Sequence, residues 1–228
     1  MSLGVAIVGC GLIGRKRAAA LTRGRVVVCA DVDIVRARQL AAACPDAQAI
    51  DSWEQAVSRS DVDVVIVATT NDALAAVARG ALDAGKHVLV EKPAGRSAAE
   101  VTVLREAAAR ADRRVRVGFN HRYHPAMRKA RELVDSGAVG ELMFLRARYG
   151  HGGRLGYEQE GRAQPAISGG GELIDQGVHV IDLARWFLGN FTSVEGVATN
   201  YFWKMPVDDN AFMTMPPGRA SDCEVARA

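Results

Sequence analysis

The stretch Leu3-Gly4-Val5-Ala6-Ile7-Val8-Gly9-Cys10-Gly11-Leu12-Ile13-Gly14 decides the fold of this 228-residue chain. Residues 3–8 predict a buried strand, and residues 12–21 predict a helix. The glycines therefore fall in a strand-to-helix turn, where backbone N–H groups and the helix N-terminus can hold a pyrophosphate. A tight turn without a ligand is the alternative. The order of strand, turn and helix favours a nucleotide, with contacts predicted at Gly9, Gly11, Leu12, Ile13 and Gly14.

The next predicted strand, residues 25–31, ends in an acid, Asp31. A carboxylate at this place bonds the ribose hydroxyls of a dinucleotide, and its charge opposes the 2′-phosphate of NADP. The sequence therefore predicts NAD, with NADP less favoured. Arg15 and Arg36 could each neutralise a phosphate, although a solvated arginine on a helix surface is the ordinary interpretation of both.

The first half of the chain alternates strands with alanine-rich helices, which predicts a doubly wound parallel sheet over residues 1–119. The loop after the strand at 62–68 is polar, and Thr69 and Asn71 are predicted to lie at the cofactor edge. Capping of the following helix by Asn71 or Asp72 is the alternative, and both roles can hold together. The predicted strands are 3–8, 25–31, 62–68, 86–90 and 114–118, and the helices include 73–84 and 98–111.

Glu91-Lys92-Pro93 follows the predicted strand at 86–90. Ligands of an open parallel sheet gather outside the carboxyl ends of its strands, so a lysine at this position is expected to face bound nucleotide. The alternative is a solvated cation at a strand end, with Pro93 stopping the strand.

After Gly118 the pattern changes to a helix following Pro125 and then strands without helical crossovers. This predicts an α+β domain over residues 120–215 with a mostly antiparallel open sheet that is incomplete. Residues 216–228 lack a strand period and begin with two prolines, so we expect a disordered tail. The predicted strands are 141–149, 192–202 and 211–215.

Gly169-Gly170-Gly171 precedes a predicted helix over residues 172–188. Asp175 and His179 are four apart and share one face of that helix, and a carboxylate beside an imidazole can handle a proton. A surface contact is the alternative, and Asp182 could instead pair with His179. The glycines favour a site, because they let backbone come close to a ligand.

The charge balance is mild, with 29 Lys and Arg against 26 Asp and Glu, a net charge of +3. The basic residues are scattered, so small molecules and other subunits are the expected partners rather than nucleic acid or a membrane. We find no apolar run long enough for a membrane span and no charged leader, and we expect a cytoplasmic protein. The four cysteines lack paired metal spacing, so we expect reduced thiols, no zinc and no disulfide.

Together these residues resemble the glucose–fructose oxidoreductase/inositol dehydrogenase (Gfo/Idh/MocA) family. The resemblance rests on the glycine loop, on Glu91-Lys92-Pro93, on Gly118-Phe119-Asn120-His121-Arg122 and on the three glycines with Asp175 and His179. It implies a nicotinamide-dependent enzyme with a Rossmann domain and an open-sheet domain that acts on sugars, cyclitols or related hydroxy compounds. It also implies that Lys92, Asp175 and His179 are catalytic, that Glu91 and Lys92 lie near the nicotinamide, and that Asn120 lines the cleft.

The sequence departs from the family pattern in two ways. Thr70 and Leu74 stand where the family usually has a proline and often a histidine, so contacts of this loop are not carried over. Family members also continue beyond the end of this chain and complete a sheet whose open face commonly forms the subunit interface. We therefore expect a truncated form with weak or absent activity, in which homo-oligomerisation is doubtful.

The predicted chemistry is oxidation of a secondary alcohol of a sugar, cyclitol or nucleotide sugar to a ketone. His179 suits the base and Lys92 suits the cation that holds alkoxide charge, while Asp175 orients one of them. A dinucleotide-binding sensor and a lyase that regenerates its nicotinamide within the cycle are the two alternatives. Residues predicted to bind substrate are Asn120, Arg122, Tyr123, His151, Arg154 and Tyr157.

Overall fold

The computed structural model describes residues 2–218 and divides into two compact units, Met1–Gly118 and Phe119–Ala228. We call them the N-terminal unit and the C-terminal unit. Cys223 and most of the tail predicted to be disordered, residues 219–228, lie outside the described residues. Within residues 2–218, no helix combines the length and the apolar character that a membrane crossing requires.

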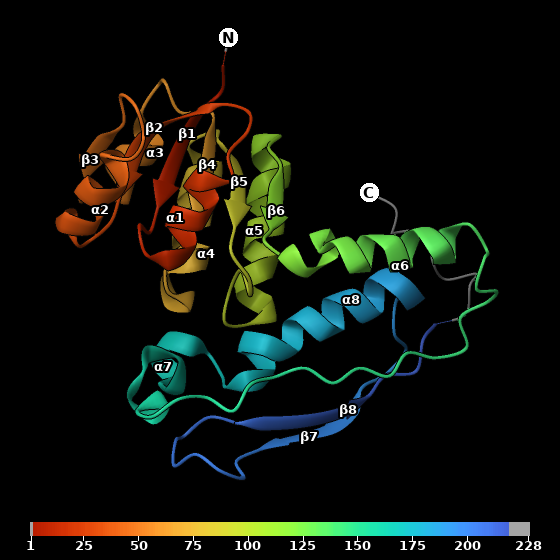
Figure 1. The fold of residues 1–228 in the computed structure, drawn as a ribbon. Coiled ribbons are helices and arrows are strands. Elements are labelled where there is room, and N and C mark those ends of the chain that lie inside the picture. Colours follow the sequence, from red (N-terminus) through yellow and green to blue (C-terminus); the bar gives the residue numbers. More distant parts are fainter. Residues whose placement is uncertain (1, 219–228) are drawn as a thin grey trace. The chain divides into compact units, whose positions relative to one another are not determined.

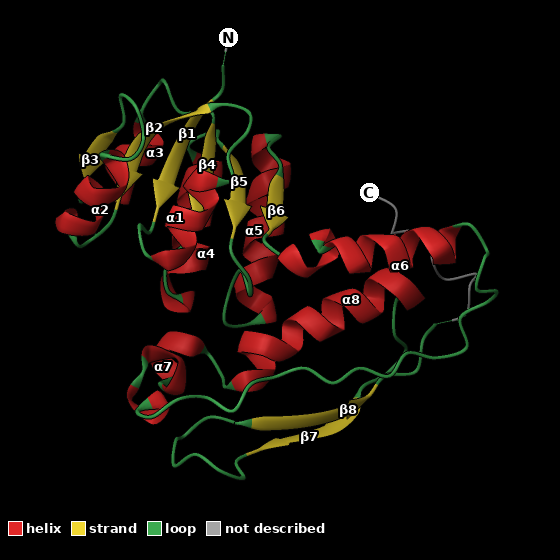
Figure 2. Ribbon diagram, in the orientation of Figure 1, coloured by secondary structure: helices red, strands yellow, loops and turns green. Residues whose placement is uncertain are grey.

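The N-terminal unit is built on one parallel sheet with the strand order β3-β2-β1-β4-β5-β6 (Figure 2). This is the order of a doubly wound dinucleotide-binding sheet, which confirms the predicted fold class. The prediction missed β3, which has only three residues. The strands are β1 (Gly4–Val8), β2 (Arg25–Ala30), β3 (Gln48–Ile50), β4 (Val64–Val67), β5 (His87–Val90) and β6 (Val115–Val117).

Helices cover both faces of this sheet, and alternate residues of β1 enter two separate apolar clusters. Ala6 and Val8 pack in the larger cluster, with residues from α3, α4 and α5. Val5 and Ile7 pack in the other, with residues from α2 and with Ala18 of α1. Burial on both faces explains why these strands are continuous apolar runs. The helices are α1 (Leu12–Ala19), α2 (Ile34–Ala41), α3 (Trp53–Ser58), α4 (Asn71–Asp83) and α5 (Ala98–Ala111).

The C-terminal unit begins with the 3-10 turn η1 (Asn120–Tyr123) and the helix α6 (Pro125–Asp135). The ring of His124 caps α6 by accepting a bond of 3.3 Å from the N–H of Ala126. Helices α6 and α8 (Val178–Leu188) lie side by side, and Arg131 Nη1 donates to the carbonyl of Trp186 at 2.6 Å (Figure 1). The short elements between them are η2 (Tyr157–Gln159), η3 (Gly161–Ala163), α7 (Pro165–Ser168) and η4 (Leu173–Gly177).

The sheet of the C-terminal unit has two antiparallel strands, β7 (Glu195–Thr199) and β8 (Asn210–Thr214). The strand predicted at 141–149 is wrong, because within residues 2–218 no ladder includes this exposed segment. Its sequence has strand character, but a strand needs a hydrogen-bonded neighbour. The strand predicted at 192–202 shortens to β7. Its C-terminal end is lost because the carboxylate of Asp209 binds the N–H groups of residues 201–203 and turns the chain there.

The predicted tail is ordered at its start. Thr192 N–H donates to the carbonyl of Pro216 at 2.9 Å, and Gly218 N–H donates to the carbonyl of Asn190 at 2.7 Å. Disorder from residue 216 was therefore a wrong prediction for residues 216–218. A proline lacks an N–H donor, but its carbonyl still accepts a bond at a strand edge.

Candidate active site

The three glycines of the first loop have three different surroundings. Gly9 has φ +91°, and a Cβ there would lie 2.4 Å from the carbonyl oxygen of Ala68. A Cβ on Gly14 would lie 2.0 Å from the carbonyl oxygen of Gly9, so α1 packs directly on the loop. A Cβ on Gly11 would meet no heavy atom of the described residues within 4 Å. A dinucleotide-binding loop needs three such glycines: one for a tight turn, here Gly9, one for open approach of the ligand, here Gly11, and one for close helix packing, here Gly14.

Asp31 connects the end of β2 to the glycine loop. Its Oδ2 accepts a bond of 2.7 Å from Cys10 N–H, and its Oδ1 accepts one of 2.9 Å from Asp33 N–H. This structural role of Asp31 could not be predicted from the sequence. Arg36 is exposed and pairs with Asp33 at 3.3 Å, and Arg15 is also exposed, so both match the surface interpretation.

The polar loop after β4 leads straight into α4, whose N-cap is Thr70. The alternative that Asn71 or Asp72 caps the helix is wrong, because α4 starts at Asn71 and both residues lie inside its first turn. Asp72 can still interact favourably with the helix dipole. Thr69, a predicted cofactor contact, donates its hydroxyl hydrogen to the carbonyl of Thr70 at 3.2 Å.

Glu91 and Lys92 follow β5 at the same carboxyl edge of the sheet. Glu91 forms an ion pair with Arg17 of α1, and only 25% of the Arg17 side chain and 12% of the Glu91 side chain are exposed. A Cβ on Gly118, just after β6, would lie 2.8 Å from Arg17 Nη2 and 2.9 Å from Glu91 Oε2. The ion pair thus joins α1 to the loop that carries Lys92 and needs a glycine beside it. Sequence reasoning missed Arg17.

The predicted cofactor residues therefore gather at one edge of the N-terminal unit. The loops after β1, β4 and β5 are hydrogen-bonded to neighbouring strands: Ala68 N–H binds the carbonyl of Val8 at 2.7 Å, and Glu91 N–H binds that of Val67 at 2.9 Å. Strand order reverses between β1 and β4, which is where open α/β sheets bind ligands.

The segment with Asp175 differs from the predicted regular helix. Residues Leu173–Gly177 form a π-helical turn, and α8 begins only at Val178. The regular i,i+4 geometry predicted for Asp175 and His179 therefore does not apply, and π-turns are frequent at functional sites. Asp175 Oδ2 accepts bonds from Arg162 Nη1 at 3.0 Å and from Gln176 Nε2 at 3.1 Å.

His179 is buried in an aromatic cluster of the C-terminal unit. Its ring stacks on that of His121 with centroids 3.9 Å apart and planes 16° from parallel. Phe119 and Tyr149 meet His179 edge-on, at 6.1 and 6.3 Å. The Tyr149 hydroxyl lies 3.4 Å from Nε2 of His121. The sequence predicted His179 and missed the stacking partner.

One glycine before this segment, Gly171, packs closely against another part of the chain. A Cβ on Gly171 would lie 1.8 Å from the carbonyl oxygen of Asp208. The Asp208 carboxylate accepts bonds from Gly171 N–H at 3.0 Å and Leu173 N–H at 2.8 Å, so it satisfies N–H groups at the start of the helical segment. At Gly171 the backbone comes close to Asp208, a residue that sequence reasoning did not identify.

Arg122, predicted to bind substrate, forms a two-point ion pair with the buried Asp182. Its Nε and Nη2 donate to the carboxylate at 2.7 and 2.5 Å, and its guanidinium lies 5.8 Å from the ring centroid of Trp186. The bond to Asp182 raises the pKa of Arg122. The structure thus pairs Asp182 with Arg122, whereas the alternative had paired it with His179.

The other predicted substrate residues differ in exposure. Tyr157 is buried and donates its hydroxyl to Glu172, and burial together with this bond raises the pKa of Tyr157. Arg154 is exposed and pairs with Glu160 at 2.7 Å, while His151 Nδ1 accepts a bond from Gly153 N–H at 3.0 Å. The side chain of Tyr157 is therefore packed inside the protein rather than exposed on the loop. Asn120 and Tyr123 are the first and last residues of η1.

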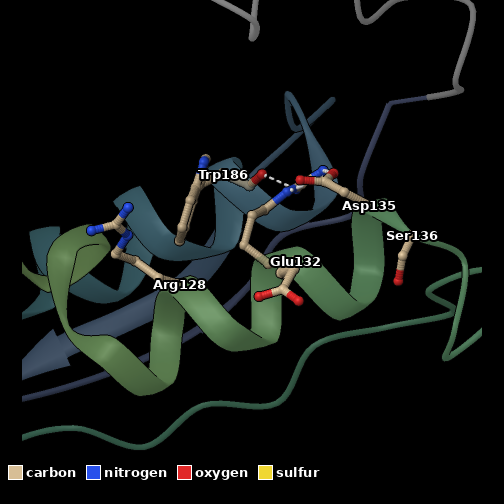
Figure 3. Close-up of a pocket in the computed structure, with 6 residues that line it drawn as sticks. Arg128, Glu132, Asp135, Ser136 and Trp186 are labelled. Atoms are coloured by element: carbon tan, nitrogen blue, oxygen red, sulfur yellow. Dashed lines mark hydrogen bonds and ion pairs between the residues drawn. The ribbon is translucent and has the colours of Figure 1, made fainter.

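A depression of about 530 Å³ lies on the surface of α6 and α8 (Figure 3). Trp186 forms one side, and Arg128, Glu132, Asp135 and Ser136 come from α6 and the turn after it. Its lining contains none of the predicted catalytic residues. Charged side chains with ion pairs of their own, such as Arg131 with Asp135, surround it.

Three free cysteines lie in the N-terminal unit. Cys10 and Cys29 are buried, and Cys10 Sγ lies 3.5 Å from the carbonyl oxygen of Ala30. The neighbouring Cys10 thiol and burial raise the pKa of Cys29, so this group stays a thiol at neutral pH. Within residues 2–218 no group of three metal-binding side chains forms.

Two family models cover most of the chain. Residues 3–119 match the oxidoreductase family with an NAD-binding Rossmann fold, and residues 127–217 match the Gfo/Idh/MocA C-terminal domain. The chain belongs to the Gfo/Idh/MocA family of oxidoreductases. The resemblance inferred from the motifs is thereby confirmed.

Similar proteins of this family include two bacterial dehydrogenases. Inositol 2-dehydrogenase of Gluconacetobacter diazotrophicus is 32% identical over 86% of this chain and 57% of its own length. Levoglucosan dehydrogenase of Pseudarthrobacter phenanthrenivorans is 32% identical over 68% of this chain and 40% of its own length. The chain thus spans about half the length of the curated relatives it matches.

Solved structures of the family superpose on nearly the whole chain. Levoglucosan dehydrogenase in complex with NADH and levoglucosan is 25% identical, with a TM-score of 0.84 over 98% of this chain and 65% of that one. An NAD-binding oxidoreductase from Klebsiella pneumoniae is 27% identical, with a TM-score of 0.77 over 95% of this chain and 61% of that one.

Proposed function

We propose that this protein oxidises a secondary alcohol of a cyclitol or sugar to a ketone and transfers the hydride to NAD. The observation that carries the proposal is the carboxyl edge of the N-terminal unit, where the three glycine roles, Asp31 and Lys92 occur together. Buried His179 in a family-matched second domain supports it.

The N-terminal unit fits a dinucleotide. Gly11 leaves open space beside the start of α1, where backbone N–H groups can bind a pyrophosphate. The Asp31 carboxylate, held at the end of β2, would accept the ribose hydroxyls and disfavour a 2′-phosphate. When bound there, NAD supplies the hydride acceptor.

In the proposed reaction, His179 takes the hydroxyl proton of the substrate, because a neutral imidazole is a base near physiological pH. The ammonium group of Lys92 stabilises the negative charge that develops on the substrate oxygen. Asp175, bonded to Arg162 and Gln176, orients the proton-handling groups. Asn120, Tyr123, His151 and Arg154 remain candidates for substrate hydroxyls, while Arg122 and Tyr157 act through Asp182 and Glu172.

The proposed substrate class follows from the relatives, which are named dehydrogenases of inositol and of levoglucosan. Both compounds carry several secondary alcohols on a six-membered ring. We therefore expect a ring polyol or an anhydrosugar as substrate. A weak rate is expected, because the C-terminal unit rests on a two-stranded sheet, which is marginal on its own.

The test is formation of NADH by the purified chain with NAD and a panel of cyclitols, sugars and nucleotide sugars. NADH formation that depends on one class of compound, and that Lys92→Met abolishes, supports the proposal. NAD binding without NADH formation on any compound would contradict it and favour a sensor. Product formation without net NADH would contradict it in favour of a lyase.

A further inference from the structure

The closest aromatic contact of His179 is another imidazole. The rings of His121 and His179 are nearly parallel at 3.9 Å between centroids, and they come from η1 and α8. Two cationic imidazoles in this arrangement would repel one another, so the second proton is bound less readily than the first. A phenyl or phenol ring at position 121 could stack equally well but would not have this effect.

The two rings differ in burial. His179 is only 6% exposed, whereas His121 is half-buried. Burial disfavours the charged form of an imidazole, so we expect His121 to take the first proton. That charge would then keep His179 neutral to lower pH.

Two charged groups on the neighbouring elements of the C-terminal unit form ion pairs. Arg122, next to His121 in η1, is bonded to Asp182 of α8, and Asp175 in the π-turn is bonded to Arg162. Tyr149, from the extended segment before residue 150, meets both rings edge-on, and Tyr123 and Arg185 complete the ionisable groups of η1 and α8. In each of these pairs, the positive charge of the arginine and the negative charge of the carboxylate largely cancel.

We propose that His121 is a positioning residue that stacks on His179 and, by taking the first proton, holds it in the neutral form that a base requires. The inference rests on the proposed role of His179, and it assigns no chemical step to His121. His121 would thereby help to set the pH range in which His179 can act as a base.

The direct test is an NMR titration of the histidine side chains in the parent chain and in His121→Phe. Removal of the neighbouring charge should move the midpoint of His179 to higher pH by about one unit. The control is His124→Asn, which removes an exposed imidazole at the start of α6 and keeps an acceptor that can cap the helix. This variant should leave the midpoint of His179 unchanged. An unchanged or lowered midpoint in folded His121→Phe would overturn the proposal.

Two further measurements test the coupling between His121 and His179 independently. In the parent chain, the signals of His121 and His179 should each report two steps, and two independent single-step curves would contradict the coupling even if no variant folded. If the chain forms NADH, the acidic limb of the kcat/KM profile should shift to higher pH in His121→Phe, with the plateau rate retained. Loss of turnover at every pH would overturn the positioning role. The titration needs no substrate, so its result does not depend on whether the proposed function is correct.

Discussion

The N-terminal and C-terminal units hold their predicted site residues by different means. In the N-terminal unit, backbone geometry holds most of the predicted residues: the loops continue from strands that are buried on both faces and bonded to neighbours, and the side chains of Asp31 and of the Arg17–Glu91 pair add to this. In the C-terminal unit, side-chain contacts fix the site: Arg122 with Asp182, Arg162 with Asp175, and the Asp208 carboxylate at the start of the π-turn. Substitutions are therefore expected to act mainly through packing in the N-terminal unit and mainly through lost charge partners in the C-terminal unit.

The largest effect is expected at Gly14. An added Cβ would lie 2.0 Å from the carbonyl oxygen of Gly9, so Gly14→Ala must displace α1 or the loop. We expect a loss of about 3 kcal/mol in the free energy of unfolding, measured with denaturant, together with loss of NAD binding. Gly11→Ala, where the space is open, should leave stability within about 0.5 kcal/mol. Equal stability of Gly14→Ala and the parent would refute the backbone account.

The next effect is expected at Asp182, which is 8% exposed. Asp182→Asn removes the charge partner of Arg122 and should lower the free energy of unfolding of the C-terminal unit by about 2 kcal/mol. Its matched control is Asp135→Asn, which breaks an exposed pair with Arg131 and should cost at most about 1 kcal/mol. The cost of each variant is measured by hydrogen exchange of α8 amides. Similar costs would show that burial does not increase the contribution of the Arg122–Asp182 pair to stability.

A smaller change is expected in cofactor choice. Asp31→Ser removes the charge that opposes the 2′-phosphate and should narrow the NAD preference over NADP by about tenfold. It also removes the acceptor for Cys10 N–H, so Asp31→Asn, which keeps an acceptor oxygen, separates the two effects. Fluorescence titration with both cofactors measures the ratio. Tighter binding of NADP than NAD to the parent chain would overturn the assignment.

The smallest effect is a pH dependence at Asp209. Burial alone would raise its pKa, but bonds from Asn210 and from the N–H groups of residues 201–203 lower it from 3.8 to about 2. Because the folded pKa is depressed, this stabilisation is fully present above pH 3.8 and is lost as the pH falls through about 2. Asp209→Asn should lack this acid-dependent loss. Identical acid profiles of exchange in the turn at 201–209 would contradict it.

Much of the N-terminal unit follows from sequence, because its strands are buried on both faces and therefore form continuous apolar runs. Helix α5, for example, has the predicted bounds Ala98–Ala111. The missed features depend on partners distant in sequence. Residues 141–149 have a strand-like pattern but no ladder partner among residues 2–218, and the contact of Gly171 with Asp208 spans 37 residues. The π-turn and the stack of His121 on His179 likewise arise from packing rather than local pattern.

We expect the N-terminal unit to bind NAD, and we expect Lys92 and His179 to serve the chemistry. The most direct measurement determines NAD affinity and NADH formation in one preparation each of the parent, Lys92→Met and His179→Ala. We expect all three to bind NAD with similar affinity, and we expect NADH formation in both variants to fall by a factor of about 100 or more. Equal rates of NADH formation in the parent and the variants would contradict the account.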